Sequence, residues 1–270
     1  MSDPLEVRMV VFDWAGTTVD FGSVAPAGAF VEAFARKGVT VTSDEARAPM
    51  GVHKKAHIEA MLKSESVGAK WREAAGRDWT RDDIDALYQL VTPMQVEAAR
   101  KHGRLVPGVR ECVAALRARG IKVAATTGYF AAAAAAVYEV AAAQGYVPDF
   151  TICADEVPAG RPAPWMIFRA MERLCVYPPA AVVKVGDTIV DIEDGRNAGV
   201  WSVGVIDSSN EMGLSEEEFN ALSAEERDSR RAAVHERYEA ARANDIINNL
   251  NELLPLIDDI NERLRACSRP

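Results

Sequence analysis

The chain has 270 residues, of which 49% are hydrophobic and 26% charged, and its formal net charge is -9. This composition is ordinary for a folded globular protein and excludes a disordered or fibrous chain. Because the negative charge offers no broad basic face, we expect neither a nucleic-acid nor a membrane partner, and an anionic ligand must be bound by a local site. The four cysteines lack CxxC spacing, which predicts reduced thiols and a cytoplasmic protein.

Short apolar runs rich in β-branched residues alternate with helical patterns along most of the chain. The runs predict strands at residues 7–12, 122–126, 150–153, 182–186 and 200–206. Since helical patterns separate most of these strands, the sheet should be parallel. We therefore predict an α/β fold with a doubly wound, Rossmann-like parallel-sheet core.

The first two predicted strands are separated by a long segment that shows no strand pattern. An ordinary crossover needs one helix and loops of only ~2–6 residues, so this segment is too long for one. Helix starts are indicated by Pro26 and by capping boxes at Thr42/Glu45 and Thr80/Asp83. We expect an inserted all-helical cap domain at residues 22–103 and a core domain made of residues 1–21 and 104–270.

The chain beyond Ile206 is charged and predicted to be helical. Capping boxes occur at Ser215/Glu218 and Ser223/Glu226. An amphipathic run then extends from Ile246 to Leu264. We expect this tail to pack against the core.

Polar side chains stand where the predicted strands end. In open α/β sheets, ligands bind beyond the carboxyl ends of the strands. We therefore expect these residues to converge on one crevice: Asp13, Thr126 with Thr127, Asp155, and Asp187 with Asp191.

Asp13 is a candidate nucleophile. It follows a buried strand and precedes a turn in which Gly16, having no side chain, lets backbone amides approach an anion. An aspartate at such a position also commonly caps the following turn. The motif alone leaves both interpretations open.

Asp187 and Asp191 lie four residues apart where a strand gives way to a helix. Mg²⁺ is usually held by one or two carboxylates, waters and phosphate oxygens. We predict a Mg²⁺ site made of Asp13, Asp187 and the Ala15 carbonyl group, with Asp191 in support. The alternative for Asp191 is that it only stabilises the helix N-terminus.

Three further residues are candidates for binding a phosphoryl group. Thr127 and Gly128 end the second core strand and offer a hydroxyl and an amide. Arg161 lies in a proline-bounded loop that would hold a cation toward the crevice. An arginine exposed on the surface is the alternative interpretation.

These segments, in this order, resemble the four motifs of the haloacid dehalogenase superfamily of phosphotransferases. The resemblance implies that Asp13 attacks phosphorus to form an acyl phosphate. In that superfamily an acid two residues later protonates the leaving oxygen, but here that position is Ala15. An oxygen leaving group benefits from such an acid, whereas a carbon leaving group needs another way to delocalise its electrons.

A lysine imine supplies that delocalisation, and the predicted cap offers two lysines. Lys54 shares a helical face with His57 and Met61, whereas Lys55 faces Glu59 and should be solvated. Lys54 is therefore the better candidate, although spacing alone is also typical of a surface lysine. Burial would lower its pKa and His57 would carry its proton.

A finer resemblance is to the phosphonoacetaldehyde hydrolase, or phosphonatase, family. The matching strings are FDWAGTTVD from Phe12, PMG from Pro49 with the Lys54/His57 pair, TTGY from Thr126, VPAGRP from Val157 and KVGDT from Lys184. This resemblance implies cleavage of phosphonoacetaldehyde to acetaldehyde and phosphate through a Lys54 Schiff base, with Mg²⁺ and a homodimer. Met50 and Tyr129 are then candidate substrate contacts.

Two features depart from that family. The helix after Tyr129 is a run of alanines, and Ser23 stands where some relatives carry cysteine. These differences leave the exact substrate open. An oxygen-ester phosphatase of the same superfamily and a catalytically silent phosphate-binding regulator therefore remain as alternatives.

Overall fold

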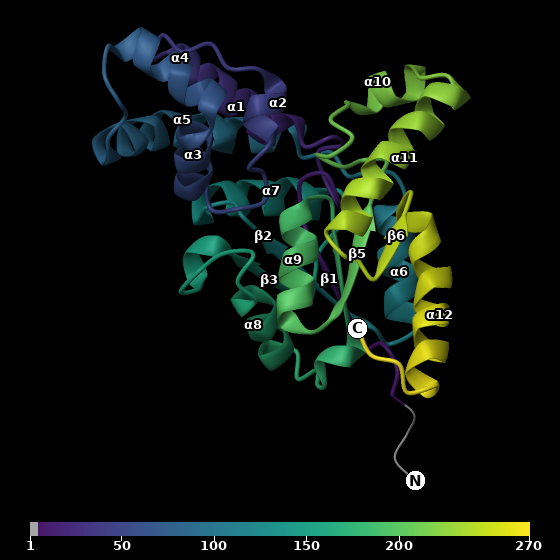
Figure 1. Ribbon diagram of the computed structural model, residues 1–270. Coiled ribbons are helices and arrows are strands. Elements are labelled where there is room, and N and C mark those ends of the chain that lie inside the picture. Colours follow the sequence, from purple (N-terminus) through teal and green to yellow (C-terminus); the bar gives the residue numbers. More distant parts are fainter. Residues whose placement is uncertain (1–4) are drawn as a thin grey trace.

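A computed structural model describes residues 5–270 of the chain. Within this range the strands form a six-stranded sheet in the order β3-β2-β1-β4-β5-β6 (Figure 1). Every neighbouring pair is parallel, and β1 lies in the centre where the chain order reverses, so the predicted doubly wound α/β fold is confirmed. The strands are β1 (Met9–Phe12), β2 (Lys122–Thr127), β3 (Phe150–Cys153), β4 (Val182–Gly186), β5 (Trp201–Val205) and β6 (Asp245–Ile247).

The strand β6 corrects the expectation for the tail. The amphipathic run was predicted to start at Ile246, but this residue pairs with Gly204 of β5 and adds an edge strand to the sheet. A strand of three residues is too short to show a period of two, while its pairing satisfies backbone groups along the edge of β5. The amphipathic helix α12 (Leu253–Arg265) begins only after it.

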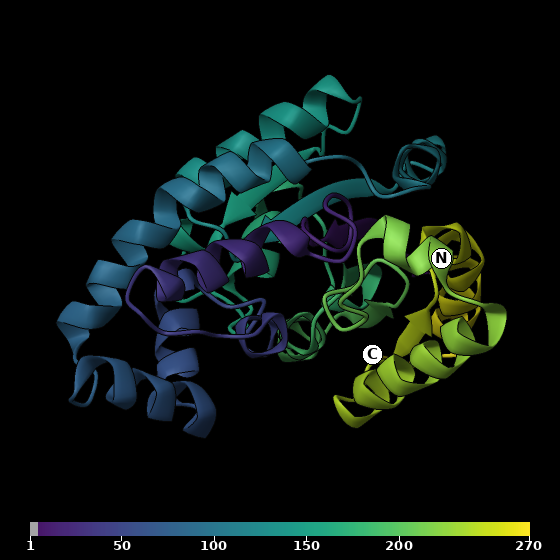
Figure 2. The ribbon, with the colours of Figure 1, turned by 90° about the horizontal axis from the view of Figure 1, so that it is seen from above.

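Helices cover both faces of the sheet, as Figures 1 and 2 show. Val10 and Phe12 of β1 point to a core shared with α6 (Val109–Ala118), α7 (Ala131–Ala143) and α12. Met9 and Val11 point to the opposite face, which α8 (Trp165–Arg173) covers together with the end of α9 (Ile189–Ala198). Side chains of α10 (Glu216–Ala221) and α11 (Ala224–Ala240) form a further cluster beside α9.

Six helices lie between β1 and β2, and the first five of them gather beyond one end of the sheet (Figure 1). Their side chains form a hydrophobic cluster that is separate from the sheet's own clusters. The capping boxes at Thr42 and Thr80 are present, as the sequence indicates. We propose that residues 22–103 form a cap domain over a core of residues 1–21 and 104–270. The five helices are α1 (Val24–Ala35), α2 (Ser43–Arg47), α3 (Lys54–Lys63), α4 (Glu65–Ala75) and α5 (Arg81–His102).

No helix in residues 5–270 combines the length and the apolar character needed to cross a membrane. The C-terminal elements instead pack on the sheet through a buried tyrosine of α11. The hydroxyl of Tyr238 lies 2.8 Å from the carbonyl oxygen of Asp187 and 3.0 Å from that of Val205. Its ring lies where a side chain at Gly204 would be, with the nearest ring carbon 2.5 Å from an added Cβ. Tyr238 therefore joins α11 to the ends of β4 and β5.

Replacing Tyr238 with phenylalanine should destabilise the fold by about 1–3 kcal/mol, because a buried carbonyl group loses its hydrogen-bond donor. Urea unfolding of the Tyr238→Phe variant measures this. Tyr177→Phe is the matched control, since Tyr177 is 76% exposed. Equal losses in the two variants would contradict the role given to the Tyr238 hydroxyl.

Candidate active site

One small pocket lies beyond the carboxyl ends of β1, β2 and β4, where the cap helices meet the sheet. Its free volume is about 20 Å³, which is close to the space needed by a single water molecule. Its lining contains these residues: Asp13, Ala15, Ser23, Pro26, Met50, Gly51, Lys54, Thr127, Gly128, Tyr129, Arg161, Asp187 and Thr188. Most of the residues that the sequence predicts for the site therefore meet here.

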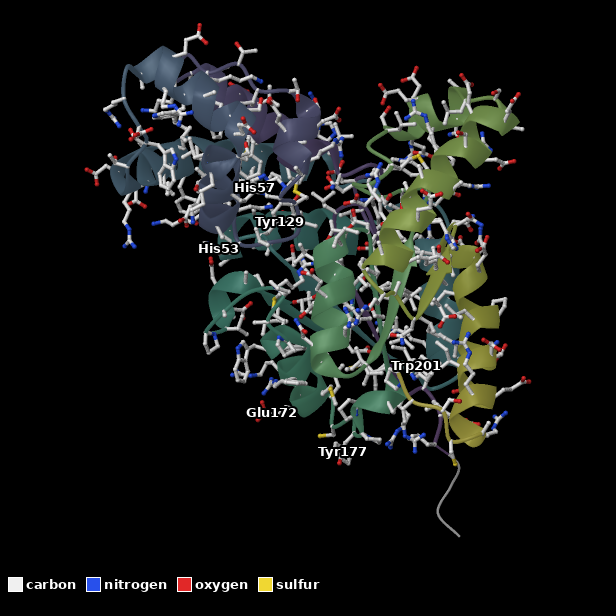
Figure 3. The ribbon with its side chains drawn as sticks, in the orientation of Figure 1. His53, His57, Tyr129, Glu172, Tyr177 and Trp201 are labelled. Atoms are coloured by element: carbon white, nitrogen blue, oxygen red, sulfur yellow. The ribbon has the colours of Figure 1, made fainter. Side chains whose placement is uncertain are left out.

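The cap side of the pocket is made by α3 and the turn before it. Figure 3 shows His53 and His57 of this region near Tyr129, at the junction of cap and sheet. Gly51 and Gly128 allow the close approach, because a Cβ on Gly128 would lie 2.8 Å from the Gly51 carbonyl oxygen. Cap and core are thus in backbone contact at the pocket, and the cap is closed.

Arg161 lines the pocket and joins the carboxylates of Asp13 and Asp191. Its Nη2 lies 2.9 Å from Asp13 Oδ1, and its Nη1 pairs with Asp191. The side chain is buried, so the interpretation of Arg161 as an exposed surface residue was wrong. Burial opposes its charge, but Asp13 and Asp191 raise its pKa further, so Arg161 remains a fixed cation.

Asp191 is tied to several groups. Its Oδ1 lies 2.8 Å from Lys184 Nζ, and its Oδ2 accepts a bond of 2.6 Å from the Thr188 hydroxyl in the capping box that begins α9. Burial opposes ionisation, yet Arg161 and Lys184 lower the pKa of Asp191 to about 2. Asp191 therefore caps the helix and anchors Arg161, and it does not line the pocket.

Asp187 is held without a cation. Its Oδ2 accepts a bond of 2.8 Å from the backbone N–H of Asn210, and Thr17 donates to Oδ1 at 3.3 Å. Burial, with Asp13 and Asp191 nearby, raises the pKa of Asp187 well above its usual value. Gly16 has a φ of +83°, and a Cβ there would lie 2.0 Å from the Asp187 carboxylate. Only glycine lets the loop after Asp13 pass so close.

This arrangement fits a divalent metal ion. Oxygen atoms of Asp13, Asp187 and Asp191 lie within 4.8 Å of one another, and all three residues are buried. Arg161 and Lys184 neutralise Asp191 and part of Asp13, while no cation in residues 5–270 forms an ion pair with Asp187. Carboxylate oxygens in excess of nearby positive charge are the donors that hard cations prefer.

Lys54 is buried in apolar surroundings, with 3% of its surface exposed. Its Nζ lies 5.7 Å from the ring centre of Phe30 and 5.1 Å from that of Tyr129. Burial, and then the charge of Arg161, lower the pKa of Lys54 to about 8 against an opposing effect of Asp13. Lys55 points outward and pairs with Asp85 at 2.6 Å, so the predicted contrast between the two lysines is present, although Lys55 does not pair with Glu59.

His57 lies behind Lys54 and does not line the pocket. Its ring stacks on Phe30 with the centres 3.8 Å apart, and its Nε2 is 2.9 Å from the Ala46 carbonyl oxygen. Nδ1 has no hydrogen-bond partner among the described residues. Burial, and then Lys54, lower the pKa of His57 well below its usual value, so the ring is neutral and its charged form is disfavoured.

Two features of the site differ from the sequence-based picture. Asp155 was expected in the crevice but instead lies 3.1 Å from His53 Nε2 and accepts a bond from the Ala131 N–H at the start of α7. Lys184 and Asn210 were given no role. A charged residue inside the buried strand β4 was a usable signal for Lys184, since buried lysines are almost always paired.

Comparisons with known proteins agree with this geometry. The family model described as haloacid dehalogenase-like hydrolase matches residues 7–199. A phosphonoacetaldehyde hydrolase of Parabacteroides distasonis is 45% identical over 262 residues, which are 97% of this chain and 99% of the relative. A phosphonoacetaldehyde hydrolase of Paraburkholderia phytofirmans is 42% identical over 264 residues, which are 98% of this chain and 99% of the relative.

The solved structures include a close neighbour. The crystal structure of a phosphonoacetaldehyde hydrolase-like protein from Oleispira antarctica matches with a TM-score of 0.96 and 40% identity, over 98% of this chain and 96% of that one. Fold, site and comparisons together define a haloacid dehalogenase-like hydrolase. The chain belongs to the haloacid dehalogenase-like hydrolases and, within them, to the phosphonoacetaldehyde hydrolase family.

The burial of Lys54 should cost stability. Its pKa falls from 10.5 to about 8, and since each pKa unit is worth ~1.4 kcal/mol the folded state loses up to roughly 3 kcal/mol at pH 7. Lys54→Met should therefore raise the free energy of unfolding at pH 7. The gain should shrink as the pH rises above 8, because the folded wild-type protein then holds a neutral amine.

Denaturant unfolding at pH 7 and pH 9 measures this gain. Lys55→Met is the control, because Lys55 is exposed and its replacement should change stability little at either pH. A Lys54→Met variant that is less stable than wild type at pH 7 would show that the amine is solvated.

Proposed function

We propose that the chain hydrolyses the carbon–phosphorus bond of phosphonoacetaldehyde, with Lys54 as the amine that forms an imine and Asp13 as the nucleophile. The observation that carries this proposal is the buried Lys54 amine in the same small pocket as the Asp13 carboxylate, where Ala15 supplies no acid. The printed names of relatives that are 42% and 45% identical support it.

The first step is imine formation. The neutral Lys54 amine attacks the aldehyde carbon, and loss of water leaves a C=N bond that is protonated on nitrogen. With a pKa of about 8, roughly a tenth of Lys54 is neutral at pH 7, compared with well under 1% for an ordinary lysine. His57 passes on the proton that Lys54 loses through its unpartnered Nδ1, directly or through a water molecule, and holds it only transiently because burial disfavours the charged ring.

The second step breaks the carbon–phosphorus bond. An Asp13 oxygen attacks phosphorus, and the electron pair of the C–P bond moves into the protonated imine, which becomes an enamine. The products of this step are a phosphoaspartyl group on Asp13 and an enamine on Lys54. No proton donor to the leaving group is needed, which agrees with Ala15.

Water completes the reaction. One water molecule hydrolyses the phosphoaspartyl group, which releases phosphate and restores Asp13. The enamine takes a proton at carbon to become an imine, and a second water molecule releases acetaldehyde and restores Lys54. Because imine formation released one water molecule, the net reaction consumes one.

The remaining pocket residues bind and orient the substrate. Arg161 and the hydroxyl and amide groups at Thr127 and Gly128 contact the phosphonate oxygens, while Met50 and Tyr129 border the aldehyde carbons. Bound Mg²⁺ would add positive charge beside the phosphonate oxygens; Asp13, Asp187 and the Ala15 carbonyl group would hold it, with Asp191 in support through Arg161. The cytoplasmic location and the homodimer stay predictions from the sequence.

Steady-state kinetics test this function. Wild-type protein with Mg²⁺ should release phosphate and acetaldehyde in equal amounts from phosphonoacetaldehyde and should have at least ~10³-fold lower kcat/KM on p-nitrophenyl phosphate. Lys54→Met and Asp13→Asn should each lose at least ~10³-fold in kcat, as should wild type with excess chelator. Lys55→Met should retain activity, because Lys55 lies outside the pocket.

Two outcomes would contradict the proposal. Activity on the oxygen ester that survives in Lys54→Met would favour an oxygen-ester phosphatase. Absence of turnover on every substrate, with phosphate still bound, would favour a silent phosphate-binding regulator.

The pocket of about 20 Å³ is too small to admit substrate as it stands, so the cap must open for binding. It must then close again, because only the closed cap brings Lys54 to the pocket. In Gly128→Ala the new Cβ would lie 2.8 Å from the Gly51 carbonyl oxygen of the cap. This contact is too short, so the substitution should keep the cap from closing fully on the core. We expect kcat/KM to fall at least ~10-fold. Gly28→Ala is the control, because an added Cβ at Gly28 meets nothing within 4 Å. Equal kcat/KM in the two variants would show that this contact is dispensable.

A further inference from the structure

The cap segment of residues 47–54 carries three residues of the pocket: Met50, Gly51 and Lys54. Both ends of this segment are bound to the core by polar side chains. Arg47 makes the contact at one end and His53 at the other. Residues 47–54 are called the pocket segment below.

At the first end, Arg47 and Asn210 bond to each other reciprocally. Arg47 Nη1 donates to Asn210 Oδ1 at 3.3 Å, and Asn210 Nδ2 donates to the Arg47 carbonyl oxygen at 3.4 Å. The same Nη1 donates to the Gly22 carbonyl oxygen at 2.5 Å. The Arg47 carbonyl oxygen also accepts from the Met50 N–H at 2.8 Å, so the contact continues directly into the turn that reaches the pocket.

Asn210 belongs to a core loop that touches the catalytic side of the pocket. Its backbone N–H donates to Asp187 Oδ2 at 2.8 Å. Two residues earlier, the Ser208 hydroxyl donates to the Gly16 carbonyl oxygen at 2.6 Å, and the Ser208 carbonyl oxygen accepts from the Gly22 N–H at 2.8 Å. One loop thus connects Asp187, the turn after Asp13, the start of the cap and Arg47.

The connection between core and cap is itself in an uncommon conformation. Asp20 and Ser23 have φ of +54° and +50°, in the left-handed region that side chains disfavour. A Cβ on Gly22 would lie 1.9 Å from the Leu214 carbonyl oxygen. Contacts elsewhere must therefore stabilise the closed position of the cap.

At the second end, His53 Nε2 lies 3.1 Å from Asp155 Oδ1, while its Nδ1 accepts the Lys55 N–H at 3.3 Å at the start of α3. This contact also joins cap to core. It does not reach Asp187 or the connection between core and cap at residues 20–23, which is called the hinge below. Both of its side chains are about one-third exposed.

We propose that Arg47 and Asn210 are positioning residues that clamp the closed cap and so fix Lys54 over Asp13. The clamp acts at the end of the pocket segment next to the hinge, where one asparagine contacts both the cap and Asp187. Neither side chain lines the pocket. This inference rests on the proposed function for its kinetic readout only.

Breaking the clamp should expose the pocket segment. The free full-length Arg47→Ala protein should exchange its backbone amides in residues 48–54 at least ~10-fold faster than wild type, as measured by hydrogen–deuterium exchange and mass spectrometry. Arg36→Ala is the matched control, because Arg36 is an exposed cap arginine that pairs with Glu32 at the end of α1. Asn210→Ala removes the same clamp from the core side and serves if Arg47→Ala fails to fold.

The pH dependence of kcat/KM is the second readout. The groups that face Lys54 are Asp13, Arg161, Tyr129 and His57, and burial makes the largest contribution to its pKa. In wild type the rising limb should have its midpoint near pH 8. In Arg47→Ala and in Asn210→Ala the limb should move at least one unit higher as water reaches the amine, with kcat/KM at pH 7 reduced at least ~10-fold.

A double-variant cycle separates a clamp from two independent contacts. Arg47→Ala combined with Asn210→Ala should lose no more kcat/KM than the worse single variant. Unchanged amide exchange and an unmoved pH limb in both single variants would overturn the proposal. If wild type shows no turnover, the proposed function fails, but the exchange experiment still decides on the clamp.

Discussion

The rest of this structure depends on one constraint, which is the burial of the Lys54 amine away from water. Lys54 Nζ lies near the rings of Phe30 and Tyr129, and the loss of hydration is the largest cause that lowers its pKa to about 8. That value exists only while the cap covers the pocket. The fold must therefore stabilise a closed cap around a group that favours water, and the proposed chemistry uses the larger neutral fraction of the amine that results.

The core supplies the opposite kind of environment within the same pocket. Carboxylates from the ends of parallel strands meet there, and Arg161 and Lys184 pair with part of their charge. Glycine makes the density of charged groups possible: a side chain at Gly16 would collide with Asp187. A negative core floor and an apolar cap roof thus place the Asp13 carboxylate opposite an amine whose pKa is lowered, an arrangement that suits the proposed cleavage of a carbon–phosphorus bond through an imine.

Periodicity and capping residues predicted five strands, the helical insertion and the cap helix starts, because these signals are local. The positions of Asp13 and Asp187 followed from the rule that strand ends converge. The three-residue strand β6 was too short to carry a period. The clamp was beyond reach for another reason: Arg47 and Asn210 are 163 residues apart, and neither has a local pattern that marks it. Asp155 was wrongly predicted to line the crevice. The end of a strand places a residue at one edge of the sheet, but it does not determine which way the side chain points.

The most direct measurement is the location of the substrate carbons after reduction. Wild-type protein treated with phosphonoacetaldehyde and sodium borohydride should gain a single two-carbon adduct, and peptide mass spectrometry should place it on Lys54. The neighbouring Lys55 should remain unmodified, since it is held outward by Asp85. An adduct that persists in a Lys54→Ala variant, or full turnover of phosphonoacetaldehyde by that variant, would contradict the central role of the buried amine.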